Sequence, residues 1–369
     1  MEARESPRNR FARSPRVTLL AVLVVLLAAM AGLLELLVRT AAIDFFAPEL
    51  RRGTPAADLG PSSLPTILAL GDSFTANPDG WVACLREGLG PATRVVGSGV
   101  SGFTARQIAR IAPRRVARFA PRVVVLQLYA GNDLLELKHP VDWRRGRPLR
   151  NLFWTLSDAG LEAPGLLNHR AGQLAAAVIR RTGRARITDA KRLALEARPF
   201  SPALFTARDR ELLSIDPFVL ERQLRLTGGM EEAFARYGSG LRSILDTCRA
   251  GGTRVLVFVV PHAVEVDPLY RKRFEALGAR FEDPGALEAP ESPFGLAVQG
   301  VVASAPGAAF LDVKPALREA QRCGTAVYRN NDSHFSPEGD RVVARVVLDA
   351  LSSPGLDLSG AAGKGPGEK

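Results

Sequence analysis

Five short apolar segments, each rich in β-branched residues and bounded by glycine, proline or charge, constrain the fold of this chain most. They are Thr66 to Leu70, Arg94 to Val96, Val123 to Leu128, Arg254 to Val260 and Ala308 to Val313. Strands that are apolar along almost their whole length are buried on both faces, as in a parallel sheet covered by helices. The segments therefore predict a buried parallel sheet.

Helical patterns lie between these segments. Apolar residues recur at helical spacing from Trp81 to Leu89, and Gly90 is a stop signal. Thr104 and Gln107 form a capping-box pattern that starts a second helix, which Pro113 is expected to interrupt. Two more patterns run from Met230 to Cys248 and onward from the Ser336–Pro337 cap. Strands alternating with helices predict an α/β fold with a doubly wound parallel sheet.

A long uncharged segment precedes this domain. Val17 to Leu34 contains 18 residues without a charge, and Glu35 and three further apolar residues follow before Arg39. This length suffices to span a bilayer. Arginines dominate the residues before it, which predicts a cytoplasmic N-terminus and an exported remainder. A cleaved signal peptide is the alternative, although its apolar region is usually only ~7 to 15 residues long.

These signals predict five segments. Residues 1–16 form a basic cytoplasmic N-terminus, 17–38 a transmembrane anchor and 39–65 a linker. The main folded domain is expected over 66–351, with a helical insertion over 134–229, and 352–369 is expected to be a disordered tail. The basic insertion is interpreted as a solvated face, as a lid over the site, or as a surface facing anionic lipid or glycan.

The net charge of +11 is compatible with an anionic partner, and equally with coding that favours arginine. No basic run is interleaved with aromatic residues, so we expect no nucleic-acid partner. The three cysteines are far apart and lack the CxxC spacing of zinc sites and redox dithiols. They are interpreted as structural, and no metal or cofactor is predicted.

Ser73 follows the first predicted strand in the segment Leu68 to Asn77 (LALGDSFTAN). In an open parallel sheet, function gathers at the carboxyl ends of the strands, where loops meet helix N-termini. A serine there is either a helix cap or a nucleophile whose oxyanion is stabilised by the helix start. Ser73 therefore needs a base nearby before it is interpreted as catalytic.

His334 is the best-placed of the four histidines to act as that base. It lies in a polar loop that enters the last helix, at the same sheet edge as Ser73, and Asp332 is positioned to orient its imidazole. His262, which follows the fourth strand, is the second candidate. His139 and His169 lie in the insertion and are predicted to be surface histidines.

Two other strand ends offer oxyanion donors. Gly102, after the second strand, is expected to bring a backbone N–H close to a substrate carbonyl. Asn132, after the third strand, is expected to aim its amide at the same oxygen. Each is also ordinary turn chemistry by itself. Together, four strand ends present a nucleophile, two donors and a base in order.

With these residues in place, the sequence resembles the SGNH hydrolases, also called the GDSL family. Gly71-Asp72-Ser73 resembles the nucleophile block, Gly102 the oxyanion glycine, Asn132 the oxyanion asparagine and His334 the general base. The four blocks occur in order across Thr66 to Leu351, and the insertion is unmatched. The resemblance implies a flavodoxin-like three-layer α/β/α sandwich, metal-independent ester chemistry and an acyl-serine intermediate.

Three positions depart from the family pattern. The glycine of the third block, Gly131, is adjacent to Asn132 instead of two residues before it. The aspartate that usually stands three residues before the histidine is replaced by Asn331, and Asp332 stands two before. The usual asparagine of the second block is Gly97. The role assigned to Asp332 therefore depends on a different spacing.

The sequence thus predicts a membrane-anchored extracytoplasmic serine esterase that acts on carboxylic esters of acyl or acetyl groups. An O-acyltransferase that uses the same site on exported glycan or lipid is the alternative, and a non-catalytic binding module of the same fold is the third hypothesis. The expected partners are an ester substrate and the membrane. The site would lie in the periplasm of a bacterium, or outside the cell if the N-terminal segment is cleaved.

Overall fold

The computed structural model describes residues 15–40, 43–135, 137, 151–152, 155–157, 160–181 and 198–353. The chain divides into two compact units, one made of 1–45 with 147–186 and the other of 46–146 with 187–369. The predicted insertion, 134–229, therefore contributes to both units. His139, most of the basic N-terminus 1–16 and most of the predicted tail 352–369 lie outside the described residues.

The larger unit is built on a five-stranded parallel sheet with strand order β2-β1-β3-β4-β5. This is the order of flavodoxin-like doubly wound sheets. The five segments predicted as strands all form strands, with small differences at their ends: β1 Thr66–Gly71, β2 Arg94–Gly99, β3 Val123–Tyr129, β4 Arg254–Val260 and β5 Ala308–Leu311. The predicted α/β fold with a parallel sheet is confirmed.

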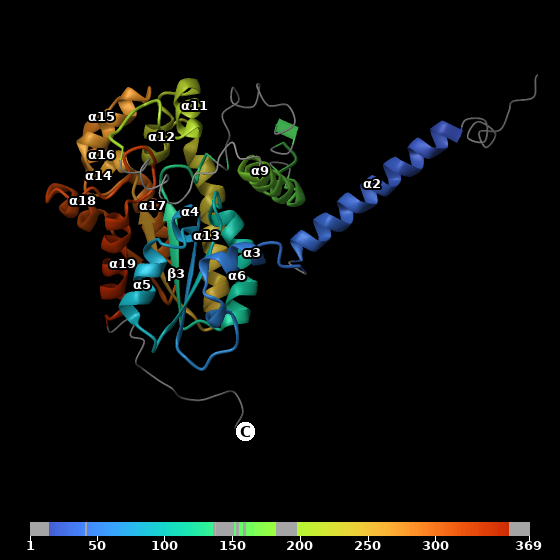
Figure 1. Ribbon diagram of the computed structural model, residues 1–369, viewed down its shortest axis with the longest axis horizontal. Helices are drawn as coiled ribbons and strands as arrows, with labels where there is room; N and C mark the ends of the chain where they lie inside the picture. Colours follow the sequence, from blue (N-terminus) through green and yellow to red (C-terminus); the bar gives the residue numbers. More distant parts are fainter. Residues whose placement is uncertain are drawn as a thin grey trace, which may run out of the picture. The chain divides into compact units, whose positions relative to one another are not determined.

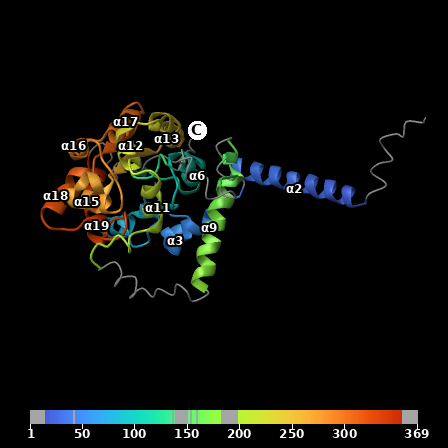
Figure 2. The same ribbon diagram turned by 90° about the horizontal axis from the view of Figure 1, so that it is seen from above.

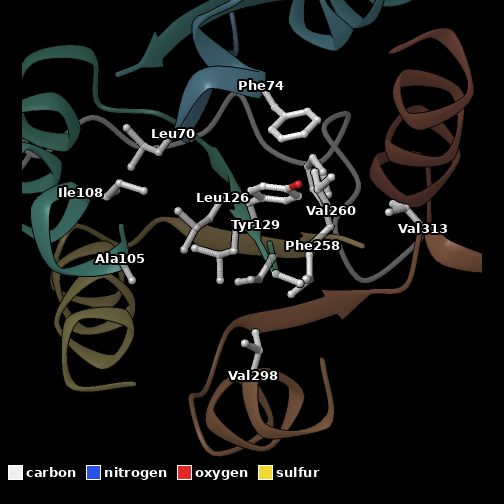
Figure 3. Close-up of a cluster of buried hydrophobic side chains, with 14 of the residues drawn as sticks. Leu70, Phe74, Ala105, Ile108, Leu126, Tyr129, Phe258, Val260, Val298 and Val313 are labelled. Carbon is white, nitrogen blue, oxygen red and sulfur yellow. The ribbon is translucent and has the colours of Figure 1, made fainter. Parts of the chain in front are cut away.

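Helices cover both faces of the sheet (Figure 1). On one face α5 (Trp81–Leu89) packs against α19 (Pro337–Leu351), and on the other α6 (Ala105–Phe119) packs against α13 (Met230–Ala250). The core is aliphatic and aromatic, and Figure 3 shows side chains from β1, β3 and β4 meeting those of the flanking helices. Burial of this apolar surface on both faces is the main stabilising term, at about 25 cal/mol per Å².

Helix α6 corrects the prediction that Pro113 interrupts it, because the helix continues through the proline to Phe119. Proline lacks the N–H that would bond to the carbonyl four residues earlier, which costs roughly 3 kcal/mol or more in a helix interior. Buried residues on both sides of Pro113, including Ile111 and Val116, pack against the core. This burial outweighs the lost hydrogen bond.

The predicted linker, 39–65, is also corrected in part. It contains α3 (Ala47–Gly53) and a short 3-10 helix, Ala56–Leu59, and Leu50 lies in the core. Thr54 Oγ1 donates to the carbonyl of Gly97 at 2.9 Å and accepts from its N–H at 3.0 Å. A Cβ on Gly97 would lie 2.6 Å from the carbonyl oxygen of Gly53. Gly97 therefore allows this segment to pack directly on β2.

The structure also contains several helices that the sequence patterns did not single out. Helix α4 (Ser73–Ala76) follows β1, and α11 (Ala207–Ile215) and α12 (Val219–Arg225) precede α13. Four helices connect β4 to β5, and one precedes the His334 loop. They are α14 (Ala263–Val266), α15 (Pro268–Ala276), α16 (Pro284–Glu288), α17 (Pro293–Ala303) and α18 (Lys314–Arg322).

The smaller unit contains two long helices, α2 (Pro15–Arg39) and α9 (Ala163–Arg181), which are visible in both ribbon views (Figures 1 and 2). Helix α2 coincides with the predicted anchor. It is the one described helix whose length and composition suit a membrane span, and none of its residues is buried. A signal sequence would pass the same test.

Candidate active site

Ser73 is the first residue of α4, two residues beyond the end of β1. The Asp72 carboxylate caps this helix, because its Oδ1 accepts from the N–H of Phe74 at 2.9 Å. A Cβ on Gly71 would lie 2.2 Å from Thr75 Oγ1 and 2.4 Å from Gln127 Oε1. Asp72 is thus the cap of the Gly-Asp-Ser block, and glycine is required for the turn to close over β3. The serine is left free of the capping role.

The structure brings Ser73, His334 and Asp332 together from opposite ends of the domain. His334 Nε2 lies 2.8 Å from Ser73 Oγ, and His334 Nδ1 lies 2.8 Å from Asp332 Oδ1. The carboxylate accepts a hydrogen bond from Nδ1–H, which fixes the proton on Nδ1 and leaves Nε2 unprotonated toward the serine. The arrangement can therefore accept a proton from the Ser73 hydroxyl.

The loop that carries His334 is held by its own backbone. Tyr328 and Phe335 form an antiparallel bridge, and the N–H of Arg329 donates to the carbonyl of His334 at 3.0 Å. The imidazole packs against the ring of Phe74, with centroids 4.8 Å apart. Phe74 also contacts Phe335, at 4.9 Å. The histidine is therefore oriented by packing as well as by Asp332.

The charges around His334 favour its protonated form. Burial lowers the pKa of His334, but the hydrogen bond and negative charge of Asp332 and the charge of Asp72 outweigh it, so this pKa lies above its usual value. Burial raises the pKa of Asp332, and the hydrogen bond and charge of His334 more than reverse this. The pair is an imidazole of increased basicity beside a carboxylate that stays ionised.

Two buried acids lie behind the site. Burial raises the pKa of Asp72 to about 6, against the hydrogen bond from Phe74 and the charge of His334. Burial and the charge of Asp72 raise the pKa of Asp133 well above its usual range. Asp133 Oδ2 accepts from Tyr237 Oη at 2.8 Å and from the N–H of Tyr129 at 3.2 Å. Asp133 therefore fixes the start of the Asn132 turn.

The predicted oxyanion donors flank the serine. In the sheet, β1 lies between β2 and β3, so Ser73 is placed between the loops that carry Gly102 and Asn132. Gly102 has φ +77°, and a Cβ there would meet no atom within 4 Å. Among the described residues, no hydrogen bond engages the N–H of Ser73, the N–H of Gly102 or the Asn132 amide. All three donors are available to a ligand.

His262 is not brought to the serine. The Nδ1 atom of His262 accepts from the backbone N–H of Val264 at 3.3 Å. The backbone N–H of His262 donates to Glu265 Oε2 at 2.8 Å, so His262 caps α14. Its ring stacks with Tyr129, with centroids 6.1 Å apart, and burial lowers its pKa to about 3. A histidine that stays neutral in the core is a structural residue, which leaves His334 as the candidate base.

The sequence reasoning missed the residues that hold the His334 loop from outside. Asn331 Oδ1 accepts from the N–H of Ser201 at 2.8 Å, and its Nδ2 donates to the carbonyls of Arg198 and Pro199 at 3.3 and 3.2 Å. Ser333 Oγ donates to Asp209 Oδ2 at 2.8 Å. The second half of the insertion thus clamps this loop. An asparagine at the position where the family has aspartate was the available signal.

Comparisons with known proteins give matches among solved structures alone. No family model and no curated protein matches the sequence. TesA is 17% identical, with the match covering 78% of this chain and 97% of TesA at a TM-score of 0.36. Axe2, an acetylxylan esterase from Geobacillus stearothermophilus, is 16% identical over 81% of this chain and 99% of Axe2, with a TM-score of 0.39. The acetyl xylan esterase AlAXEase is 11% identical over 78% of this chain and 99% of that enzyme, with a TM-score of 0.40.

The structure itself supplies the sheet order 2-1-3-4-5 and the Ser73–His334–Asp332 chain of hydrogen bonds. It places the four sequence blocks at neighbouring strand ends and in the last helical loop, as the resemblance implies. The fold and the arrangement of these residues agree with what the resemblance to the SGNH hydrolases implies.

Proposed function

We propose that this protein is a serine esterase that hydrolyses carboxylic esters through an acyl-serine intermediate. The 2.8 Å contact between Ser73 Oγ and His334 Nε2, continued by the 2.8 Å contact between His334 Nδ1 and Asp332 Oδ1, carries the proposal. A serine hydroxyl is a weak nucleophile until an adjacent base removes its proton. The observed chain of contacts provides that base and orients it.

In the first half-reaction Ser73 Oγ bonds to the ester carbonyl carbon as its proton passes to His334 Nε2. The oxyanion is stabilised by the backbone N–H groups of Ser73 and Gly102 and by the Asn132 amide. The bond to the alcohol oxygen then breaks, and that oxygen takes the proton from His334. Removal of a single oxyanion donor typically costs 10²- to 10³-fold in rate.

In the second half-reaction His334 takes a proton from water, and the water oxygen attacks the acyl carbon. The same three donors stabilise the second tetrahedral intermediate. His334 returns the proton to Ser73 Oγ as the acyl–oxygen bond breaks and the carboxylic acid leaves. Asp332 stays ionised throughout and stabilises the imidazolium that forms twice in each cycle.

We place this site outside the cytoplasm, anchored by α2. The uncharged run from Val17 to Leu34 is about 27 Å long as a helix, close to the ~30 Å hydrocarbon core of a bilayer. Arg4, Arg8, Arg10, Arg13 and Arg16 precede it, and Lys and Arg are retained on the cytoplasmic side. Cleavage after this segment would instead release the domain, and N-terminal sequencing of the mature chain distinguishes the two.

The test is turnover of p-nitrophenyl acetate, butyrate and octanoate by the full chain in detergent. Ser73→Ala and His334→Ala should each lose activity, and His169→Ala, which changes a histidine of the other unit, should retain it. A fluorophosphonate probe should label the wild type and not Ser73→Ala. Unchanged turnover in Ser73→Ala contradicts the proposal.

Transfer of the acyl group to a sugar hydroxyl would use the same acyl-serine. Adding soluble sugar acceptors to the assay separates the two reactions, because transfer yields an acylated sugar and hydrolysis yields free acid alone. A folded chain that neither turns over esters nor reacts with the fluorophosphonate would instead be a binding module.

A further inference from the structure

A polar junction joins the membrane-span helix α2 to helix α9 within the smaller unit. The Glu35 carboxylate accepts from the N–H of Glu162 at 2.9 Å and from the N–H of Ala163 at 2.8 Å. These N–H groups belong to the first turn of α9, where a helix lacks internal acceptors and attracts negative charge. Glu35 therefore caps α9 from another helix.

Arg39 completes this junction. Its Nε lies 2.6 Å from Glu35 Oε1, and its Nη2 donates to the carbonyl of Gly160 at 2.5 Å. Arg170, about two turns further along α9, donates to the carbonyl of Phe45. The start of α9 is thus tied to α2 and to the segment that follows it by charged groups at three positions.

The junction fixes the depth at which α9 begins. Glu35 is the first charge after the uncharged run of α2, and Arg39 follows one helical turn later, so both lie where the apolar segment ends. Charged side chains at the end of a span reside at the membrane–water interface. Because Glu35 bonds directly to its first turn, α9 begins at the extracytoplasmic interface. Figures 1 and 2 show α9 running across α2 and not alongside it.

One side of α9 is an exposed apolar stripe. Leu167, Leu174 and Val178 are 44%, 67% and 50% exposed, and Ala171 is exposed between them. Their spacing places all four within about 60° of one another around the helix. Exposed leucine and valine at these fractions, gathered on one side, mark a surface that contacts another apolar phase.

The other side of α9 is occupied within the unit. Leu166 is buried, and Gln173 lies 3.0 Å from His169 Nε2. Arg170 bonds to Gln173 as well as to the carbonyl of Phe45. The helix therefore has one face engaged with its own unit and one apolar face left toward its surroundings.

We propose that α9 is an interfacial helix that lies on the outer leaflet, with the stripe Leu167, Ala171, Leu174 and Val178 in the boundary between headgroups and acyl chains. This inference rests on the proposed anchoring by α2. The lipid surface is the expected partner because the stripe starts from a helix end that is itself at the interface, and because the stripe carries no charge. In this arrangement Glu35, which ends the uncharged run of α2, holds the first turn of α9 at the interface.

The test uses single tryptophans added to the full chain in phosphatidylcholine vesicles, with and without lipids brominated on the acyl chains near the headgroup. Leu174→Trp and Val178→Trp report on the stripe, and Leu26→Trp reports on the anchor with lipids brominated deeper in the chain. Gly172→Trp is the matched control, because Gly172 lies away from the stripe and a Cβ there meets no atom within 4 Å. Wild-type emission from the native tryptophans is subtracted.

We expect brominated lipid to remove about half of the added emission from Leu174→Trp and Val178→Trp and little from Gly172→Trp. Quenching of Leu26→Trp without quenching at 174 and 178 overturns the interfacial helix and leaves the anchor intact. Equal quenching at 172 and 174 also overturns it, because the contact would not follow the stripe. Absence of quenching at all four positions shows that the anchoring itself is wrong.

A second copy of this chain is the alternative occupant of the stripe. In that case emission at 174 and 178 would be unaffected by brominated lipid and would shift to longer wavelength as the vesicles are diluted to one chain each. That result overturns the lipid assignment. Far-UV circular dichroism of each variant, compared with the wild type, verifies that the added tryptophan leaves the helices in place.

Discussion

Asp332 Oδ1 lies 2.8 Å from His334 Nδ1, although only one residue separates the two in the sequence. The SGNH pattern places the aspartate three residues before the histidine, and here Asn331 occupies that position with its amide turned to Ser201 and Pro199. The short spacing is compatible with a hydrogen bond because the loop from Tyr328 to Phe335 folds back tightly on itself. The orienting carboxylate has therefore moved by one residue while its contact with the imidazole is preserved.

Asp332→Asn should lower kcat for p-nitrophenyl esters by about 10²- to 10⁴-fold, because the imidazole loses its orienting carboxylate and the stabilisation of its protonated form. The matched control is the double variant Asn331→Asp, Asp332→Asn, which puts the aspartate at the position usual for the family. We expect no recovery of kcat in the double variant, since residue 331 faces the segment 198–201. Recovery would show that the loop adopts the family spacing.

The acid limb of the pH–rate profile should report His334. The base must be neutral to accept the Ser73 proton, and the pKa of His334 lies above its usual 6.5, since Asp332 and Asp72 outweigh burial. Values of kcat/KM should therefore fall as the pH decreases through a midpoint above 6.5, and Asp332→Asn should move that midpoint to lower pH. The release of p-nitrophenol is followed at its isosbestic wavelength. A midpoint near 4 to 5 would contradict the assignment of His334 as the base.

Asn331→Ala should lower kcat by about tenfold with little change in the midpoint of the acid limb, because Asn331 positions the His334 loop and leaves the Asp332 contact in place. Asn330→Ala is the matched control, since Asn330 makes one hydrogen bond to the same segment, 3.1 Å from its Nδ2 to the carbonyl of Arg198. We expect less than a twofold change for it. Equal effects of the two variants would mean that the clamp acts through general stability and not through the loop geometry.

Asp340→Asn should stabilise the fold increasingly as the pH rises. Burial raises the pKa of Asp340 to about 7, so the folded state holds a proton that the unfolded state releases from its usual pKa near 4. The free energy of unfolding of the wild type therefore falls, by up to about 4 kcal/mol, as the pH rises from about 4 to 7. The asparagine oxygen can still accept from the N–H of Trp81, at 2.9 Å in the wild type.

Urea unfolding of the detergent-solubilised chain, followed by tryptophan fluorescence at pH 5 and pH 8, measures this difference. The variant should be similar to the wild type or slightly less stable at pH 5 and more stable at pH 8. A constant difference between the two chains at both pH values would show that Asp340 does not titrate in this range.

The sheet was predictable from sequence because a strand buried on both faces needs apolar residues along its whole length, a local property. The segments from Thr66 and Val123 show it directly, and the caps at Thr104 and Ser336 mark the helices that follow. Pro113 misled the prediction because local propensity was outweighed by burial of the residues on either side. The folded part of the linker was missed because α3 is only seven residues long and too short to show an apolar period.

Part of the candidate site was likewise predictable from sequence, and part depended on the tertiary structure. The sequence by itself determined that Ser73, Gly102, Asn132 and His334 fall at strand ends and in the last helical loop, because parallel strands deliver their carboxyl ends to one edge. Only the tertiary structure decided that His334 and not His262 contacts Ser73, since both lie just before a helix and their side-chain directions depend on packing far away in the chain.

The tertiary structure also decided which loop residue orients the imidazole and what holds that loop. Asn331 and Asp332 are neighbours whose sequence order gives no indication of which one faces the histidine. The clamp by 198–209 and the capping of α9 by Glu35 join residues separated by more than one hundred positions. Local periodicity specifies which elements form, whereas hydrogen bonds between distant segments depend on the positions that the whole fold gives to their backbones.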